Sequence, residues 1–96
     1  MMEFLPLAAR IREYLAELER VVDRAIRFAA DANRTGEDAY WDAVALNLHS
    51  YYSGVERIFE DIARTIDGTL PDGADWHQRL LFQMSAEIPG IRPAVI

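Results

Sequence analysis

The 96-residue chain has no cysteine, no lysine and no apolar run long enough to cross a bilayer. Without cysteine, disulfides and thiolate metal sites are excluded, and a reducing compartment is the expected setting. A membrane-spanning helix needs about 20 apolar residues in a row, and the opening of the chain, with Glu3 and regularly spaced charges, does not resemble a signal peptide. We therefore expect a cytoplasmic protein that does not enter a membrane.

Basic residues are also few: the chain has 10 basic and 16 acidic residues, and its net charge is −6. This sign opposes a general attraction to polyanions such as RNA. Local recognition stays open, because every basic residue is an arginine and guanidinium binds phosphate bidentately. Apolar residues make up 51% of the chain, which is typical of a folded domain. The length predicts a single domain over residues 1–96.

Apolar residues recur at alternating spacings of four and three in the first third of the chain, which predicts a helix over about residues 4–32. This stripe consists of Phe4, Ala8, Ile11, Leu15, Leu18, Val22, Ala25 and Ala29. A second stripe with a seven-residue period runs beside it at Leu7, Tyr14, Val21 and Phe28. The combined face is wider than one partner helix covers, so we expect two neighbours for this helix.

The same spacing returns from Trp41 to Ile66 and predicts a second helix over about residues 37–66. Between the helices, the turn formers of residues 31–36 reverse the chain, and Thr35 or Asp38 is expected to cap the second helix. Two helices with matching stripes predict an antiparallel hairpin. The fold class is all-α.

A third, short helix is predicted over about residues 76–87, after a turn rich in proline and glycine. Asp75 with Gln78 forms a variant capping box at its start. Its apolar face is expected to consist of Trp76, Leu80, Leu81 and Met84. At ~18 Å this helix is less than half as long as the hairpin, so apolar surface is left over. We expect an incomplete helical bundle, covered by a homodimer partner or by further helices after Ile96.

Three segments in order carry a family resemblance: His49-Ser-Tyr-Tyr, Gly54-Val-Glu-Arg-Ile-Phe and Pro71-Asp-Gly-Ala-Asp-Trp-His-Gln-Arg-Leu-Leu. With the helices that hold them, they resemble the first three helices of HepT-like proteins in the HEPN superfamily. That resemblance implies a toxin that cleaves RNA without a metal, forms a homodimer and pairs with a nucleotidyltransferase antitoxin.

The catalytic signature of that family, an arginine followed four to six residues later by a histidine, does not occur in this sequence. Within the resemblance, histidine moves the proton and arginine neutralises charge on the phosphate. The arginine preceding His49 is Arg34, and the one preceding His77 is Arg64. We therefore assign no catalytic residue, and we expect the 96 residues alone to be inactive on RNA.

Four side chains of the second helix are candidates for contacts with RNA or a partner protein. His49 and Glu56 share one helix face, and Arg57 and Arg64 offer guanidinium groups. A solvated polar face is the alternative interpretation of all four. His77 and the Tyr51-Tyr52 pair are assigned structural roles, in the short helix and in the core.

No set of metal ligands and no phosphate-binding loop is found, so we expect no cofactor. Two hypotheses remain open. The chain is the amino-terminal part of a HepT-like ribonuclease toxin whose catalytic motif follows Ile96, or it is a non-catalytic helical partner or decayed toxin that acts through dimerisation. A reading frame that continues into an Arg-x4-6-His motif favours the first.

Overall fold

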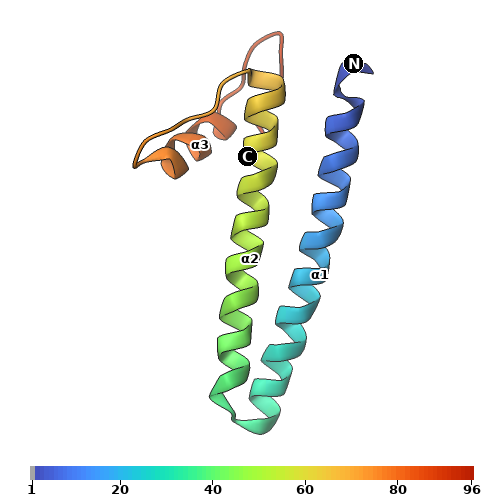
Figure 1. The fold of residues 1–96 in the computed structure, drawn as a ribbon, viewed down its shortest axis with the longest axis vertical. Coiled ribbons are helices and arrows are strands. Elements are labelled where there is room, and N and C mark those ends of the chain that lie inside the picture. The colour runs from blue at the N-terminus through green and yellow to red at the C-terminus, as the bar shows by residue number, and fades with distance from the viewer. Residues whose placement is uncertain (1) are drawn as a thin grey trace. The chain divides into compact units, whose positions relative to one another are not determined.

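The computed structural model describes residues 2–96, and helices account for the regular structure in that range. The elements are η1 (Met2–Phe4), α1 (Leu5–Thr35), α2 (Asp38–Ile62), η2 (Ala63–Asp67) and α3 (Trp76–Ser85). The helices α1 and α2 pack antiparallel, and α3 is short (Figure 1). The predicted all-α fold is confirmed, and so is the predicted order of two long helices and one short one.

The chain divides into two compact units, and each long helix contributes to both. Unit 1 holds the chain up to Arg10 together with Arg57–Ile96, and unit 2 holds Ile11–Glu56. The buried apolar residues of unit 1 are Leu7, Ile58, Phe59, Ile62, Ala63, Leu80 and Met84. Those of unit 2 are Leu18, Val21 and Ala32. Unit 1 therefore has the larger core.

The two apolar stripes of α1 differ in part in burial, although Leu18 of the first stripe is buried. Leu7 and Val21, from the stripe with the seven-residue period, are buried, whereas Leu15 and Val22, from the other stripe, are exposed. The large apolar side chains exposed on unit 2 are Leu15, Val22, Ile26, Trp41, Leu46, Leu48 and Tyr52. We call these side chains the apolar surface of unit 2, leaving out Leu46, which lies about half a turn around α2 from Leu48.

Gly54 marks the close approach of α1 to α2 within unit 2. A Cβ atom at this position would lie 2.5 Å from Cδ2 of Leu18. Glycine inside a helix costs about 1 kcal/mol relative to alanine, and close packing against the buried Leu18 side chain offsets that cost. The sequence-based expectation of a closely packed neighbouring helix agrees with this contact.

The ends of the first two helices follow the predicted turn chemistry with one difference. Gly36 and Gly68 adopt positive φ angles of 71° and 75°, the left-handed conformation that ends helices. The hydroxyl oxygen of Thr35 accepts a hydrogen bond from the Glu37 N–H, at 3.2 Å. Thr35 therefore bonds the residue before α2 instead of an N–H within its first turn.

The predicted capping box of α3 is wrong. Asp75 is the residue before the helix, but its carboxylate makes no capping hydrogen bond. Its backbone, at φ −103° and ψ 21°, lies outside the extended region that a capping residue adopts. The predicted apolar face of α3 is right for Leu80 and Met84, which are buried, and wrong for Leu81, which is half exposed.

Candidate functional site

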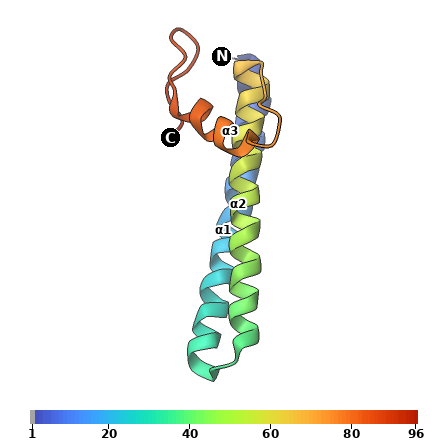
Figure 2. The ribbon, with the colours of Figure 1, turned by 90° about the vertical axis from the view of Figure 1, so that its left-hand side faces the viewer.

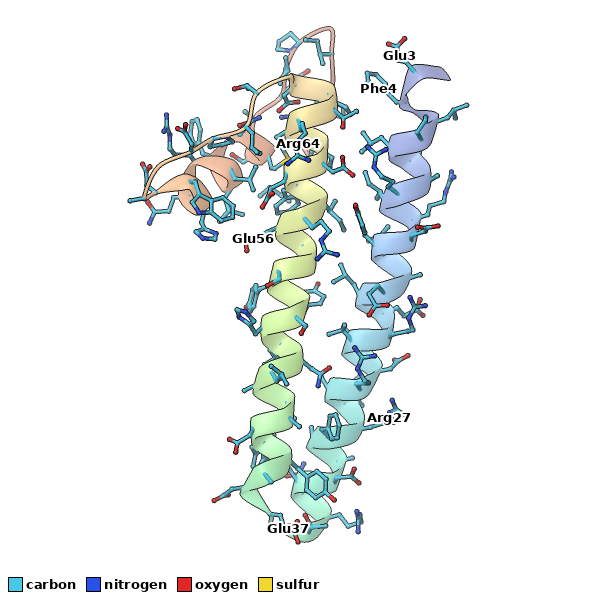
Figure 3. The ribbon with its side chains drawn as sticks, in the orientation of Figure 1. Glu3, Phe4, Arg27, Glu37, Glu56 and Arg64 are labelled. Carbon is cyan, nitrogen blue, oxygen red and sulfur yellow. The ribbon has the colours of Figure 1, made fainter. Side chains whose placement is uncertain are left out.

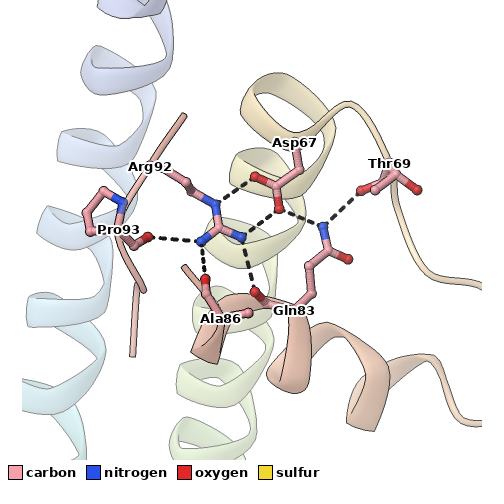
Figure 4. A network of polar contacts seen from close by, with 6 residues as sticks. All are labelled: Asp67, Thr69, Gln83, Ala86, Arg92 and Pro93. Atoms are coloured by element: carbon pink, nitrogen blue, oxygen red, sulfur yellow. Dashed lines mark hydrogen bonds and ion pairs between the residues drawn. The ribbon is translucent and has the colours of Figure 1, made fainter. Parts of the chain in front are cut away.

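A buried polar cluster of unit 1 joins the end of η2 to the segment after α3 (Figure 4). Arg92 donates from Nε to Oδ1 of Asp67 at 2.6 Å and from Nη2 to Oδ2 of Asp67 at 2.7 Å. The two side chains are only 5% and 1% exposed. This is a bidentate ion pair, the geometry in which a guanidinium binds a carboxylate most strongly.

The remaining N–H groups of Arg92 bind backbone carbonyls. Nη1 donates to Ala86 O at 2.8 Å and to Pro93 O at 3.0 Å, and Nη2 donates to Gln83 O at 3.0 Å. A guanidinium has five N–H donors, and all five are used here. Arg92 therefore has no donor left for a phosphate group, and its role is structural.

The cluster also ends α3 and fixes the chain that follows it. Carbonyl groups in the last turn of a helix have no partner inside the helix, and Arg92 supplies one to Gln83 O. Val95 N donates to Met84 O at 2.8 Å. After α3 the chain makes a loop and returns to the helix (Figure 2). The segment after Ser85 thus acts as the cap of α3.

The same ion pair shifts both ionisable groups. Hydrogen bonding to Arg92 lowers the pKa of Asp67 below its ordinary value of 3.8, although burial alone would raise it. The Asp67 carboxylate raises the pKa of Arg92. Both groups are therefore charged at neutral pH.

We predict that acid weakens unit 1 through Asp67. Because its folded pKa is depressed, its contribution to stability is fully present above the unfolded pKa of about 3.9, and it is lost as the pH falls through the folded pKa. Urea unfolding between about pH 6 and pH 3 measures this loss. Asp67→Asn should be less stable than the natural chain at neutral pH and should lose less stability on acidification. An equal loss in both proteins contradicts the prediction.

A second bidentate pair lies in unit 1. Arg10 donates from Nε and Nη2 to the two carboxylate oxygens of Asp61, each at 2.9 Å. Hydrogen bonding to Arg10 lowers the pKa of Asp61, with burial opposing it. Asp61 is buried and Arg10 is half exposed, so this pair is the more solvated of the two.

Of the four residues predicted to contact RNA or a partner, His49, Glu56 and Arg57 lie on α2 and Arg64 lies on η2. Glu56 and Arg64 are labelled in Figure 3. His49 and Glu56 belong to unit 2, and Arg57 and Arg64 belong to unit 1. His49, Arg57 and Arg64 are exposed and Glu56 is half-buried. Arg64 Nη2 lies 3.9 Å from Glu60 Oε2, a loose contact of small energetic value.

The aromatic residues near these positions differ in their exposure to solvent. The rings of Trp76 and His77 are 3.5 Å apart between centroids, and Trp76 is half-buried. Tyr51 is half-buried, but Tyr52 is 68% exposed. The prediction of a core position is therefore wrong for Tyr52, which belongs to the exposed apolar surface of unit 2.

An apolar groove runs between α1 and α2 in unit 2. Its volume is about 330 Å³, and Val22, Ile26, Leu48 and Tyr51 are among the residues that line it. Ile26 also lines an adjacent hollow, together with Arg20, Arg24 and Arg27. The groove is thus apolar inside, and the hollow beside it holds three guanidinium groups together with the carboxylate of Asp23.

Within residues 2–96 there is no group of three or more His, Asp or Glu side chains placed to hold a metal ion. In the same range, no helix is long and apolar enough to span a membrane.

Comparison with known proteins gives one match. The sequence model of a family described as HepT-like protein matches residues 43–96. The matched range includes α3 and the Asp67–Arg92 pair. No curated protein and no solved structure matches the chain.

Proposed function

The chain belongs to the HepT-like protein family, and from this membership we propose that it is the toxin component of a toxin–antitoxin pair whose antitoxin is a nucleotidyltransferase. The observation that carries the proposal is the family match over residues 43–96. The activity that we propose for the intact toxin of this family is metal-independent cleavage of RNA.

The 96 residues are proposed to lack that activity on their own. An arginine four to six residues before a histidine is absent from the sequence, so no pair can both move the proton and neutralise the phosphate. The alternative function is that of a non-catalytic binding partner of a nucleotidyltransferase, and a reading frame that continues into an Arg-x4-6-His motif would argue against it.

An RNA-cleavage assay tests this proposal. The purified natural chain and the purified His49→Ala variant are each incubated with single-stranded RNA, in separate reactions at the same protein concentration. A mock purification from cells that lack the gene gives the background level of cleavage. We expect neither protein to cleave RNA above that level. Cleavage by the natural chain that disappears in the His49→Ala variant would overturn the proposal.

The proposed binding mode includes a second copy of the chain on the apolar surface of unit 2. The hollow beside the groove of unit 2 holds three arginines, Arg20, Arg24 and Arg27, against one carboxylate, Asp23, whereas every Asp, Glu, Lys or Arg residue between positions 37 and 56 is acidic. That acidic segment also carries exposed Trp41, Leu48 and Tyr52. A two-fold axis that places α2 of each copy against α1 of the other matches apolar with apolar and arginine with carboxylate.

A further inference from the structure

One face of α3 borders a hollow in unit 1 that the family match does not explain. Residues Asp75, Gln78, Arg79 and Phe82 line it at spacings of three and four, and Thr69 and Pro71 form the opposite wall. Its volume is about 560 Å³, which is within the range of small-ligand sites. The lining combines an aromatic ring, a carboxylate and a guanidinium.

The aromatic ring is the most exposed part of this wall. The Phe82 side chain is 75% exposed, while its neighbours Leu80 and Met84 are buried. An exposed phenyl ring beside a hollow offers a flat surface on which a nucleobase can stack.

Two polar side chains of the hollow, Asp75 and Arg79, are weakly bonded, whereas Gln83 donates to Asp67 and Thr69. Asp75 stands directly before α3, where an aspartate ordinarily caps the helix, yet its carboxylate makes no capping bond. Arg79 donates from Nη1 to Asp72 O at 3.3 Å, which is long for a hydrogen bond. A carboxylate acceptor on the residue before α3 and a guanidinium donor in the first turns of α3 thus line the same hollow.

Guanine is the base whose edges fit this pair. Its N1–H and N2–H₂ groups donate to a carboxylate, and its O6 and N7 atoms accept from an arginine. Adenine would turn its N1 lone pair toward the carboxylate, and the pyrimidines offer a smaller ring for stacking. Because the base itself is neutral, the net charge of −6 does not oppose its binding as it would oppose a contact with phosphates.

We propose that the hollow on α3 is a guanine-binding subsite for single-stranded RNA. Phe82 stacks on the base, Asp75 binds its N1 and N2 hydrogens, and Arg79 binds O6 and N7. The choice of RNA as the source of the base rests on the proposed function; the fit to guanine does not.

The test is a titration of the ¹⁵N-labelled chain with GMP and AMP, followed by the backbone amide signals of residues 69–88. We expect GMP to shift these signals and to bind at least about tenfold more tightly than AMP, the discrimination typical of a bidentate base contact. The trinucleotide UGU should bind more tightly than GMP, and UAU should not. Equal binding of GMP and AMP, or GMP binding more tightly than UGU, would overturn the proposal.

Single substitutions test the stacking contact and the hydrogen bonds of the proposed subsite one at a time. Phe82→Ala should weaken GMP binding about tenfold, and Asp75→Asn should remove the preference for GMP over AMP. Arg12→Gln, on unit 2, is the control and should leave both unchanged. Circular dichroism establishes that each variant is folded. Self-association that Phe82→Ala abolishes, with no response to GMP, would identify a protein contact and overturn the proposal. Absence of RNA cleavage has no bearing on this result, because the titration measures binding alone.

Discussion

Replacement of Arg92 by methionine is expected to lower the free energy of unfolding by about 3–5 kcal/mol, the cost of leaving a buried charge without its partner. The carboxylate of Asp67 is 1% exposed and would lose both of its bonds to the guanidinium. The carbonyl groups of Gln83, Ala86 and Pro93 would lose donors as well. The segment after α3 would then lose its attachment to η2.

Urea unfolding followed by circular dichroism, at one chain concentration for all variants, measures this loss. The control is Arg34→Met, because the Arg34–Asp31 pair is exposed on both sides and should contribute little. The double variant Asp67→Leu with Arg92→Met should recover much of the loss, because an apolar pair can replace a buried ion pair. Stability of the Arg92→Met variant equal to that of the natural chain would contradict the structural role of this cluster.

Replacement of Leu48 by arginine is expected to weaken the proposed homodimer at least about thirtyfold, which corresponds to about 2 kcal/mol and to the loss of a central contact. Leu48 lines the apolar groove of unit 2. In the proposed pairing it meets the partner's α1, so a cation at this position would be desolvated and would face the three arginines of the other copy.

The matched control is Leu81→Arg. Leu48 and Leu81 are 49% and 50% exposed, both lie on helices, and leucine and arginine have similar helix propensities. Leu81 belongs to α3 of unit 1, outside the proposed interface. Sedimentation equilibrium should give the dimer for Leu81→Arg and mainly monomer for Leu48→Arg. If the two substitutions weakened the dimer equally, the effect would be a general one of added charge, and the proposed interface would be contradicted.

Apolar spacing was sufficient to predict the helices, because a buried helix face imposes a period of 3.6 residues on the sequence. The glycines at positions 36 and 68 set the ends, since both need a left-handed backbone. The same reasoning explained Gly54 by a closely packed neighbour. These features depend on local sequence, which is why the sequence was enough.

The polar contacts of unit 1 could not be predicted in the same way. Asp67 and Arg92 are 25 residues apart, and no local pattern indicates that they meet. An arginine between two prolines, in a non-helical segment with apolar neighbours, was the available signal. The capping role given to Asp75 failed because the turn before α3 sets its backbone outside the capping conformation. Whether His49, Glu56, Arg57 and Arg64 contact RNA or a partner stays a prediction.

The proposed cover of the apolar surface of unit 2 is a second copy of the chain. Sedimentation equilibrium of the natural protein across a range of micromolar concentrations measures whether that copy binds. We predict the mass of a dimer, twice the 11.0 kDa of the chain. A monomer throughout that range that binds no hydrophobic dye would contradict the account.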